Sequence, residues 1–131
     1  MNGWPTLDRR AFAGGAAALL LAGNATKGMT MADAPRLFGM IGKIRSTPGK
    51  RTELLTHLAA GSRGMPGNRL YLIAEDRGDP DGLWVTEVWD SKEDHAASLK
   101  LPQVQEAIAK ARPIIAGFET SVQITPVEGL R

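Results

Sequence analysis

The chain has 131 residues and no cysteine. This absence excludes disulfides, thiolate metal sites and cysteine nucleophiles, although it does not assign a redox compartment. Histidine is almost absent as well, because only His57 and His95 occur, far apart in the sequence and without a carboxylate cluster at ligand spacing. A metal site built on them is therefore not expected.

The sequence also lacks a large excess of either charge, since the formal net charge is +2 and the basic residues are scattered. A nucleic-acid surface is not predicted. No glycine-rich loop follows a strand and opens a helix, so a nucleotide phosphate cradle is not expected. A serine-centred nucleophile elbow is missing too. Enzyme chemistry here would have to proceed with few protein groups and no evident cofactor.

The composition that remains is 43% hydrophobic and 23% charged, which is typical of a globular protein with one domain. Residues 1–28 are expected to be a leader and linker outside that domain. Arg9-Arg10-Ala11-Phe12 resembles a twin-arginine signal, and a mildly apolar run over 13–22 is too short to span a bilayer. Cleavage after Ala25 would release a periplasmic protein with no membrane segment.

An alternative start codon would change the expected location. Met29 and Met31 lie just before the first expected strand and could begin a cytoplasmic protein. The sequence favours export, because an accidental upstream reading frame seldom produces paired arginines followed by an apolar run.

Residues 35–128 predict one domain. Four strands are expected where apolar residues lie between turn residues, over 37–45, 68–76, 83–90 and 117–126. Helices are expected over 49–62, from Ser91 to Leu101, and between Pro102 and Pro113. The order β-α-β-β-α-β, with the second helix split in two, predicts an α+β fold of ferredoxin-like type with helices on one face of an antiparallel sheet.

Local signals add detail to this pattern. Ser91-Lys92-Glu93-Asp94 has the form of a capping box, so Ser91 is expected to cap the helix that follows. In the last strand, alternation predicts that four residues share one face: Phe118, Thr120, Val122 and Ile124.

The strand over 83–90 has two different faces. Alternation places Leu83, Val85, Glu87 and Trp89 together, and Trp84 and Val88 on the opposite side. Helices can cover only one side of such a sheet, and the other would still carry apolar residues. A second copy of the chain is the simplest cover, which predicts a homodimer whose sheets meet as a dimeric α/β barrel.

The join between this strand and the next helix carries the candidate site. Trp89 is expected either to anchor the join within the core or to form a flat wall for an aromatic ligand, with its indole N–H as donor. His95 shares a helix face with Leu99 and should point inward. There it could take a proton from a phenolic substrate, or it could be a satisfied core histidine.

Glu87 is a carboxylate inside an otherwise apolar strand. Its burial would cost on the order of several kcal/mol unless it is paired. A structural partner is expected, with Arg69 and Arg112 as candidates, and a catalytic role is the alternative. Asn68 and Tyr71 open the second strand and could hydrogen-bond a ligand.

Four short motifs add a resemblance that runs from Leu37 to Val127. They are Pro48-Gly49-Lys50, Met65-Pro66-Gly67-Asn68, Asp79-Pro80-Asp81 and the run from Glu87 to Glu93. Together they resemble the antibiotic biosynthesis monooxygenase (ABM) domain family, which includes quinol monooxygenases. The resemblance implies a dimeric α+β barrel that oxidises quinols, phenols or polycyclic aromatic substrates with O₂, and that uses no metal or flavin.

The resemblance also implies roles for individual residues. A deprotonated substrate would supply the electron that activates O₂, while the protein orients the phenol and keeps water out. Trp89 matches the family's pocket tryptophan by position. The helix and strand positions of the other candidates, and not the resemblance, suggest that His95 would accept the proton and that Val85 and Leu99 would line the pocket. The chain departs from many relatives at Ser98, where they carry a histidine, and at Val85, where some active enzymes place an amide. A non-catalytic barrel that binds small aromatic ligands is the competing hypothesis.

Overall fold

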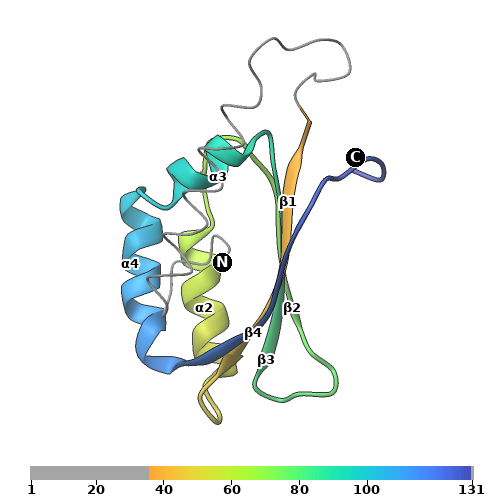
Figure 1. Cartoon of the computed structure of the whole chain (residues 1–131). Coiled ribbons are helices and arrows are strands. Elements are labelled where there is room, and N and C mark those ends of the chain that lie inside the picture. The colour runs from red at the N-terminus through yellow and green to blue at the C-terminus, as the bar shows by residue number, and fades with distance from the viewer. Residues whose placement is uncertain (1–35, 131) are drawn as a thin grey trace.

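Pairing places the first strand of the domain in the middle of the sheet. The computed structural model describes residues 36–130 (Figure 1). The four strands are β1 (Phe38–Ser46), β2 (Asn68–Glu75), β3 (Gly82–Trp89) and β4 (Ile115–Ile124). They form one antiparallel sheet in the order β2-β3-β1-β4. The expected leader over 1–28, with its signal and alternative starts, lies outside the described residues.

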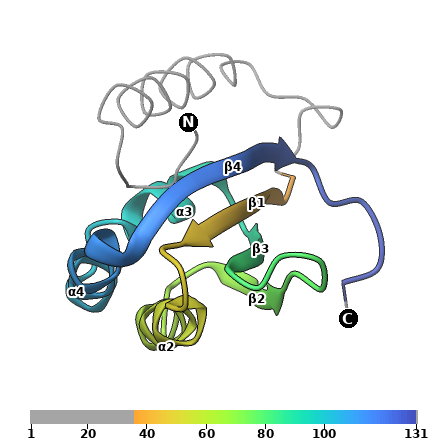
Figure 2. The ribbon, with the colours of Figure 1, turned by 90° about the horizontal axis from the view of Figure 1, so that it is seen from below.

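Three helices lie on one face of this sheet (Figure 2). They are α2 (Arg51–Gly61), α3 (Lys92–Ser98) and α4 (Pro102–Ala111), and a short 3-10 turn, η2 (Arg112–Ile114), leads into β4. The α+β ferredoxin-like prediction is confirmed, including the split second helix. No helix among the described residues is long and apolar enough to cross a membrane.

The split second helix has a local cause at each end. The Ser91 hydroxyl accepts a hydrogen bond from the Asp94 backbone N–H at 3.0 Å, so the predicted cap of α3 is confirmed. Pro102 occupies the first turn of α4, where its missing N–H costs little. Gly61 at the end of α2 touches α4, because a Cβ atom there would lie 2.5 Å from the Ala107 Cβ.

The two faces of the sheet differ as the alternation predicts. Met40, Ile44 and Leu83 lie on the helix side and are almost completely buried. Trp84 and Val88 lie on the opposite side, which no described helix covers (Figures 1 and 2). Leu72 and Val122 share that side and remain 51% and 46% exposed.

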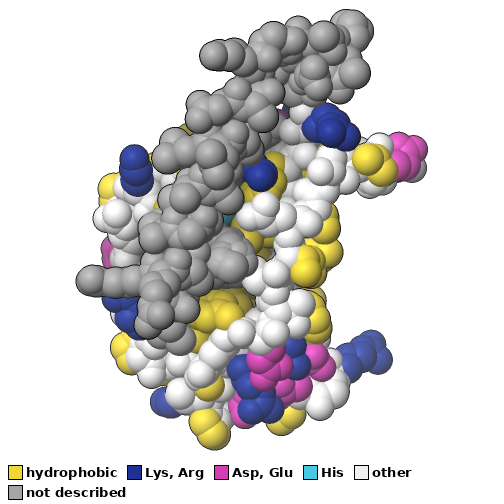
Figure 3. Space-filling model, viewed as in Figure 1, with side chains coloured by type: hydrophobic (Ala, Val, Ile, Leu, Met, Phe, Trp, Pro, Cys, Tyr) yellow, Lys and Arg dark blue, Asp and Glu magenta, His cyan; other side chains and the backbone are white. Residues whose placement is uncertain are grey.

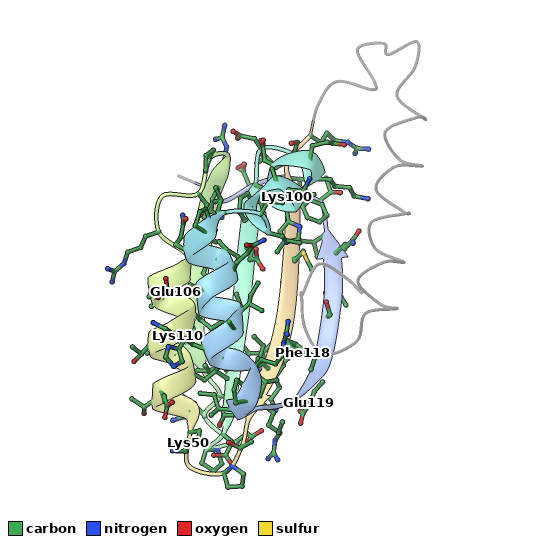
Figure 4. All side chains as sticks on the ribbon, turned by 90° about the vertical axis from the view of Figure 1, so that its left-hand side faces the viewer. Lys50, Lys100, Glu106, Lys110, Phe118 and Glu119 are labelled. Carbon is green, nitrogen blue, oxygen red and sulfur yellow. The ribbon has the colours of Figure 1, made fainter. Side chains whose placement is uncertain are left out.

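A β-bulge corrects the prediction for the last strand. Lys43 pairs with Thr120, but Ile44 pairs with Phe118, so Glu119 is an extra residue in β4 (labelled in Figure 4). Phe118 consequently packs against the core beneath the helices, together with Ile44. The other members of the predicted row lie on the uncovered face: Thr120, Val122 and Ile124. The extra residue, Glu119, reverses the alternation of side chains between Phe118 and Thr120.

Ion pairs hold the β2–β3 turn against the sheet. Arg45 donates two hydrogen bonds to the Asp79 carboxylate, each 2.9 Å long. Lys43 lies 3.2 Å from both Asp79 and Glu119. These contacts, the hydrogen bonds from Arg45 above all, lower the pKa of the Asp79 carboxyl. Figure 3 shows acidic and basic side chains gathered at this lower end of the molecule.

Candidate functional site

A cavity lies between the helix side of the sheet and the three helices. Most of its walls are apolar, and its volume is about 70 Å³. Its polar lining is limited to a few side chains, which are Ser62, Tyr71, Glu87, Trp89, His95, Ser98 and Arg112. A buried water needs roughly 10–15 Å³ of such space, so the cavity is large enough for several waters.

Glu87, Trp89 and His95 converge at one end of this cavity. Strand alternation directs Glu87 and Trp89 toward the helices, and the cap of α3 directs His95 back toward β3. Trp89 is fully buried, and His95 is only 4% exposed. The Trp89 and His95 rings meet edge to face with centroids 5.4 Å apart, and the Phe38 ring is tilted against the imidazole with centroids 5.6 Å apart.

The partner of Glu87 is the neighbouring tryptophan. The Trp89 indole N–H donates a hydrogen bond of 3.0 Å to Glu87 Oε1, and His95 Nε2 lies 3.8 Å from the same oxygen. The predicted arginine partners are wrong. Arg69 is the extra residue of a bulge in β2 and pairs with Asp90 at the surface, whereas Arg112 follows the end of α4.

Three polar groups in the cavity are left without a hydrogen bond to the described part of the chain. They are Glu87 Oε2, the imidazole of His95 and the hydroxyl of Tyr71. Buried polar groups in folded proteins nearly always have a partner, from the protein, water or a ligand. The cavity therefore offers hydrogen bonds at one end and apolar contact elsewhere.

Burial sets the protonation of these groups. It raises the pKa of the Glu87 carboxyl to about 7, although the Trp89 N–H opposes the shift. Burial also lowers the pKa of His95 to about 4, so the imidazole is neutral at physiological pH. Burial and the nearby Glu87 carboxylate raise the pKa of Tyr71 well above its usual value. At neutral pH, Glu87 alone among the three exchanges a proton readily.

The other predicted site residues divide into two groups. Tyr71 and Leu99 line the cavity. Asn68 does not, because its side-chain amide donates to the Leu70 and Val88 carbonyl oxygens at 3.0 and 3.4 Å and fastens the β2 bulge. Val85 is also outside the lining and is fully buried in the core.

Two further polar residues line the cavity and were not among the predicted site residues. Ser98 is buried, and its hydroxyl donates a 2.6 Å hydrogen bond to the His95 carbonyl, which holds the end of α3. Arg112 lines the cavity and has no acidic partner within residues 36–130. A signal existed for Arg112, because it lies four residues after Ile108 and therefore continues the inner face of α4.

Within residues 36–130, no group of three or more histidine, aspartate or glutamate side chains is arranged to hold a metal ion. The two histidines are well separated. His57 Nε2 lies 3.8 Å from the Glu53 carboxylate on α2, while His95 lines the cavity.

Comparisons with known proteins agree with this architecture. A family model described as antibiotic biosynthesis monooxygenase matches residues 37–110. A crystal structure from Chloroflexus aurantiacus J-10-fl is 50% identical, with a TM-score of 0.70, and the match covers 71% of this chain and 95% of that one. A structure from Caulobacter crescentus CB15 is 19% identical, with a TM-score of 0.63 and coverage of 72% and 92%, and supports the fold alone. Both are named "putative antibiotic biosynthesis monooxygenase". No curated protein sequence matches significantly.

Proposed function

The chain belongs to the antibiotic biosynthesis monooxygenase family, and we propose that it oxidises a small quinol or related phenol with O₂. One observation carries this proposal. A buried carboxyl and a buried neutral imidazole lie 3.8 Å apart in a mostly apolar cavity, each with unused hydrogen-bonding capacity within the described chain. An aromatic hydroxyl would satisfy both groups, while Trp89 and the aliphatic walls would contact the ring.

The size of the cavity favours a small substrate over a large one. At about 70 Å³, it holds the equivalent of about five to seven waters. A single ring with one or two hydroxyl groups comes closer to this space than a polycyclic compound. The lining side chains would still have to move apart to admit the ring, because a cavity that binds benzene measures about 150 Å³. The apolar lining from Leu58, Val104 and Ile108 favours a neutral ring over a charged one.

The proposed reaction balances without a further reductant. A quinol with a free ring position and one O₂ would give a hydroxyquinone and one water. One oxygen atom forms a bond to the ring carbon, and the other leaves as water with two hydrogens from the substrate. The substrate supplies all four electrons that O₂ takes up, and the protein orients it and excludes water.

Binding of a small aromatic ligand without turnover is the second candidate function. One feature favours it. Val85 is buried among aliphatic side chains, at a position where some active relatives place a polar amide. Val85 offers no amide for hydrogen bonding at this position.

Oxygen uptake by purified, metal-free protein separates the two functions. A panel of monocyclic quinols and phenols is expected to give uptake above the rate without protein. Ile108→Trp would fill the cavity and abolish that uptake, whereas Gln105→Trp on the exposed surface of α4 would leave it unchanged. Quenching of tryptophan fluorescence by the same compounds, without any uptake, would support the binding function instead.

A further inference from the structure

The two ionisable groups at the polar end of the cavity differ in how they are held. We propose that Glu87 is the catalytic base that removes the proton from the substrate hydroxyl, and that His95 stays neutral and positions that hydroxyl. This inference rests on the proposed oxidation, and it reverses the expectation that His95 accepts the proton.

The geometry of Glu87 suits a base. Its Oε1 accepts the indole N–H of Trp89 at 3.0 Å, which restrains the carboxyl group. Its Oε2 has no hydrogen-bond partner within the described residues, although the side chain lines the cavity. A substrate hydroxyl in the cavity would therefore meet an oriented carboxylate oxygen, which is the first requirement for proton transfer.

The surroundings of His95 oppose its protonation. The imidazole contacts the Phe38 and Trp89 rings, and its Nε2 is 3.8 Å from Glu87 Oε1, too far for a hydrogen bond. Burial lowers its pKa to about 4, whereas the pKa of Glu87 is about 7. A base is most effective when its pKa lies near the working pH, and Glu87 meets this condition.

Few other charged or titratable groups face Glu87. From β2, its cross-strand neighbour Tyr71 presents a neutral phenol. From α3 comes His95, and at the end of α4 Arg112 lines the same cavity. The neighbour from β1 is Met40, and the cavity residues of α2 are not ionisable. Glu87 is thus the only carboxyl group in the lining among residues 36–130.

The proton transfer is simple to balance. The substrate O–H bond breaks, the proton bonds to Glu87 Oε2, and the electron pair stays on the substrate oxygen. The resulting anion is the species that passes an electron to O₂. When the reduced oxygen leaves as water, it takes the proton back from Glu87, which restores the carboxylate.

The dependence of kcat/KM on pH tests this assignment in the full chain. Wild type should show a rise with an apparent pKa near 7. Glu87→Gln should lower kcat/KM at pH 7 by about 10²–10⁴-fold, and its remaining rate should rise with pH only as the substrate itself ionises. In His95→Gln, kcat/KM should still rise near pH 7, and the main effect of the substitution should be an increase in KM.

Two further measurements keep the test decisive. Glu87→Asp retains a carboxyl group. It should therefore recover part of the rate that Glu87→Gln loses, and its kcat/KM should again rise with pH. In a Trp4→Phe/Trp84→Phe background, Trp89 is the only remaining tryptophan. Its emission should change near pH 7, and that change should vanish with Glu87→Gln but persist with His95→Gln.

The outcomes separate the two proposals. Turnover by Glu87→Gln with the wild-type pH profile, or loss of that profile in His95→Gln alone, would overturn the base assignment and leave the oxidation standing. No O₂ uptake by wild type at any pH would refute the oxidation, and the base assignment with it.

Discussion

Glu87 places a carboxyl group inside an apolar cavity with a single strong donor, the Trp89 indole. Its folded-state pKa is about 7, above the usual 4.5. A group with a raised pKa contributes stability that is fully present below pH 4.5 and is lost as the pH rises through 7. The free energy at stake is about 3 kcal/mol, at 1.36 kcal/mol for each pKa unit.

Glu87→Gln should therefore stabilise the protein in alkaline solution. The amide oxygen can still accept the Trp89 N–H, but no charge has to be buried at pH 8. The free energy of unfolding in urea should exceed that of wild type by about 1–3 kcal/mol at pH 8, and by much less at pH 4.5. Equal differences at the two pH values would contradict the raised pKa.

The contribution of His95 to stability should change with pH in the opposite direction to that of Glu87. The folded-state pKa of His95, about 4, lies below the usual 6.5, so its contribution is full above pH 6.5 and is lost as the pH falls through 4. His95→Gln should therefore lose less stability than wild type between pH 7 and pH 4, in the same urea experiment. Gln105→Ala on the exposed surface of α4 is the control and should behave like wild type.

The candidate site could be predicted in outline from the sequence. Strand alternation and helix spacing were sufficient to bring Trp89 and His95 to one place. The partner of Glu87 was missed because a cation was sought, although Glu87 and Trp89 lie two residues apart on one strand face. Arg69 could not be excluded, since only the pairing of β2 reveals that it is an extra residue in a bulge.

At the scale of elements, the strand and helix order followed from the sequence, and the details of pairing did not. Periodicity and turn residues were enough to locate all four strands and the helices. A bulge depends on which residues face each other across two strands, and local periodicity carries no such information. The prediction that Phe118 shares a face with Thr120 was wrong for that reason alone.

The contact between α2 and α4 gives a prediction at this scale. Gly61→Ala would place a methyl group 2.5 Å from the Ala107 Cβ, so the helices would have to move apart. We expect a loss of about 1–3 kcal/mol in urea unfolding, reduced by up to about 1 kcal/mol because alanine favours helices.

Gly117→Ala is the control for this change. A Cβ atom at Gly117 would meet nothing within 4 Å, and the free energy of unfolding should change by less than about 0.5 kcal/mol. If the two variants have the same free energy of unfolding, the helices have room to adjust and the contact between α2 and α4 does not limit packing.

At the scale of the whole molecule, the uncovered face of the sheet favours a second copy of the chain. Leu72 and Val122 are about half exposed there, beside Trp84 and Val88. Figure 3 shows hydrophobic side chains along that side of the molecule. An apolar sheet face of this kind is usually buried in an interface.

We predict a homodimer in sedimentation experiments at micromolar concentration. Leu72→Lys and Val122→Lys should each shift the protein toward monomer, because a charge would be buried in the interface. Gln105→Lys adds the same charge on the exposed surface of α4 and should leave the dimer intact. Wild-type protein that sediments as a monomer would contradict the prediction.

The bulge at Glu119 has a consequence for how this family can change in length. Without Glu119, Thr120 would follow Phe118 directly, and both would still face their present partners, Lys43 and Ile44. A single-residue deletion at this point would remove the ion pairs of Glu119 but leave the strand in register. A deletion farther along β4, before Ile124, would turn part of the strand over. Alignment gaps in β4 among relatives are therefore expected at this position.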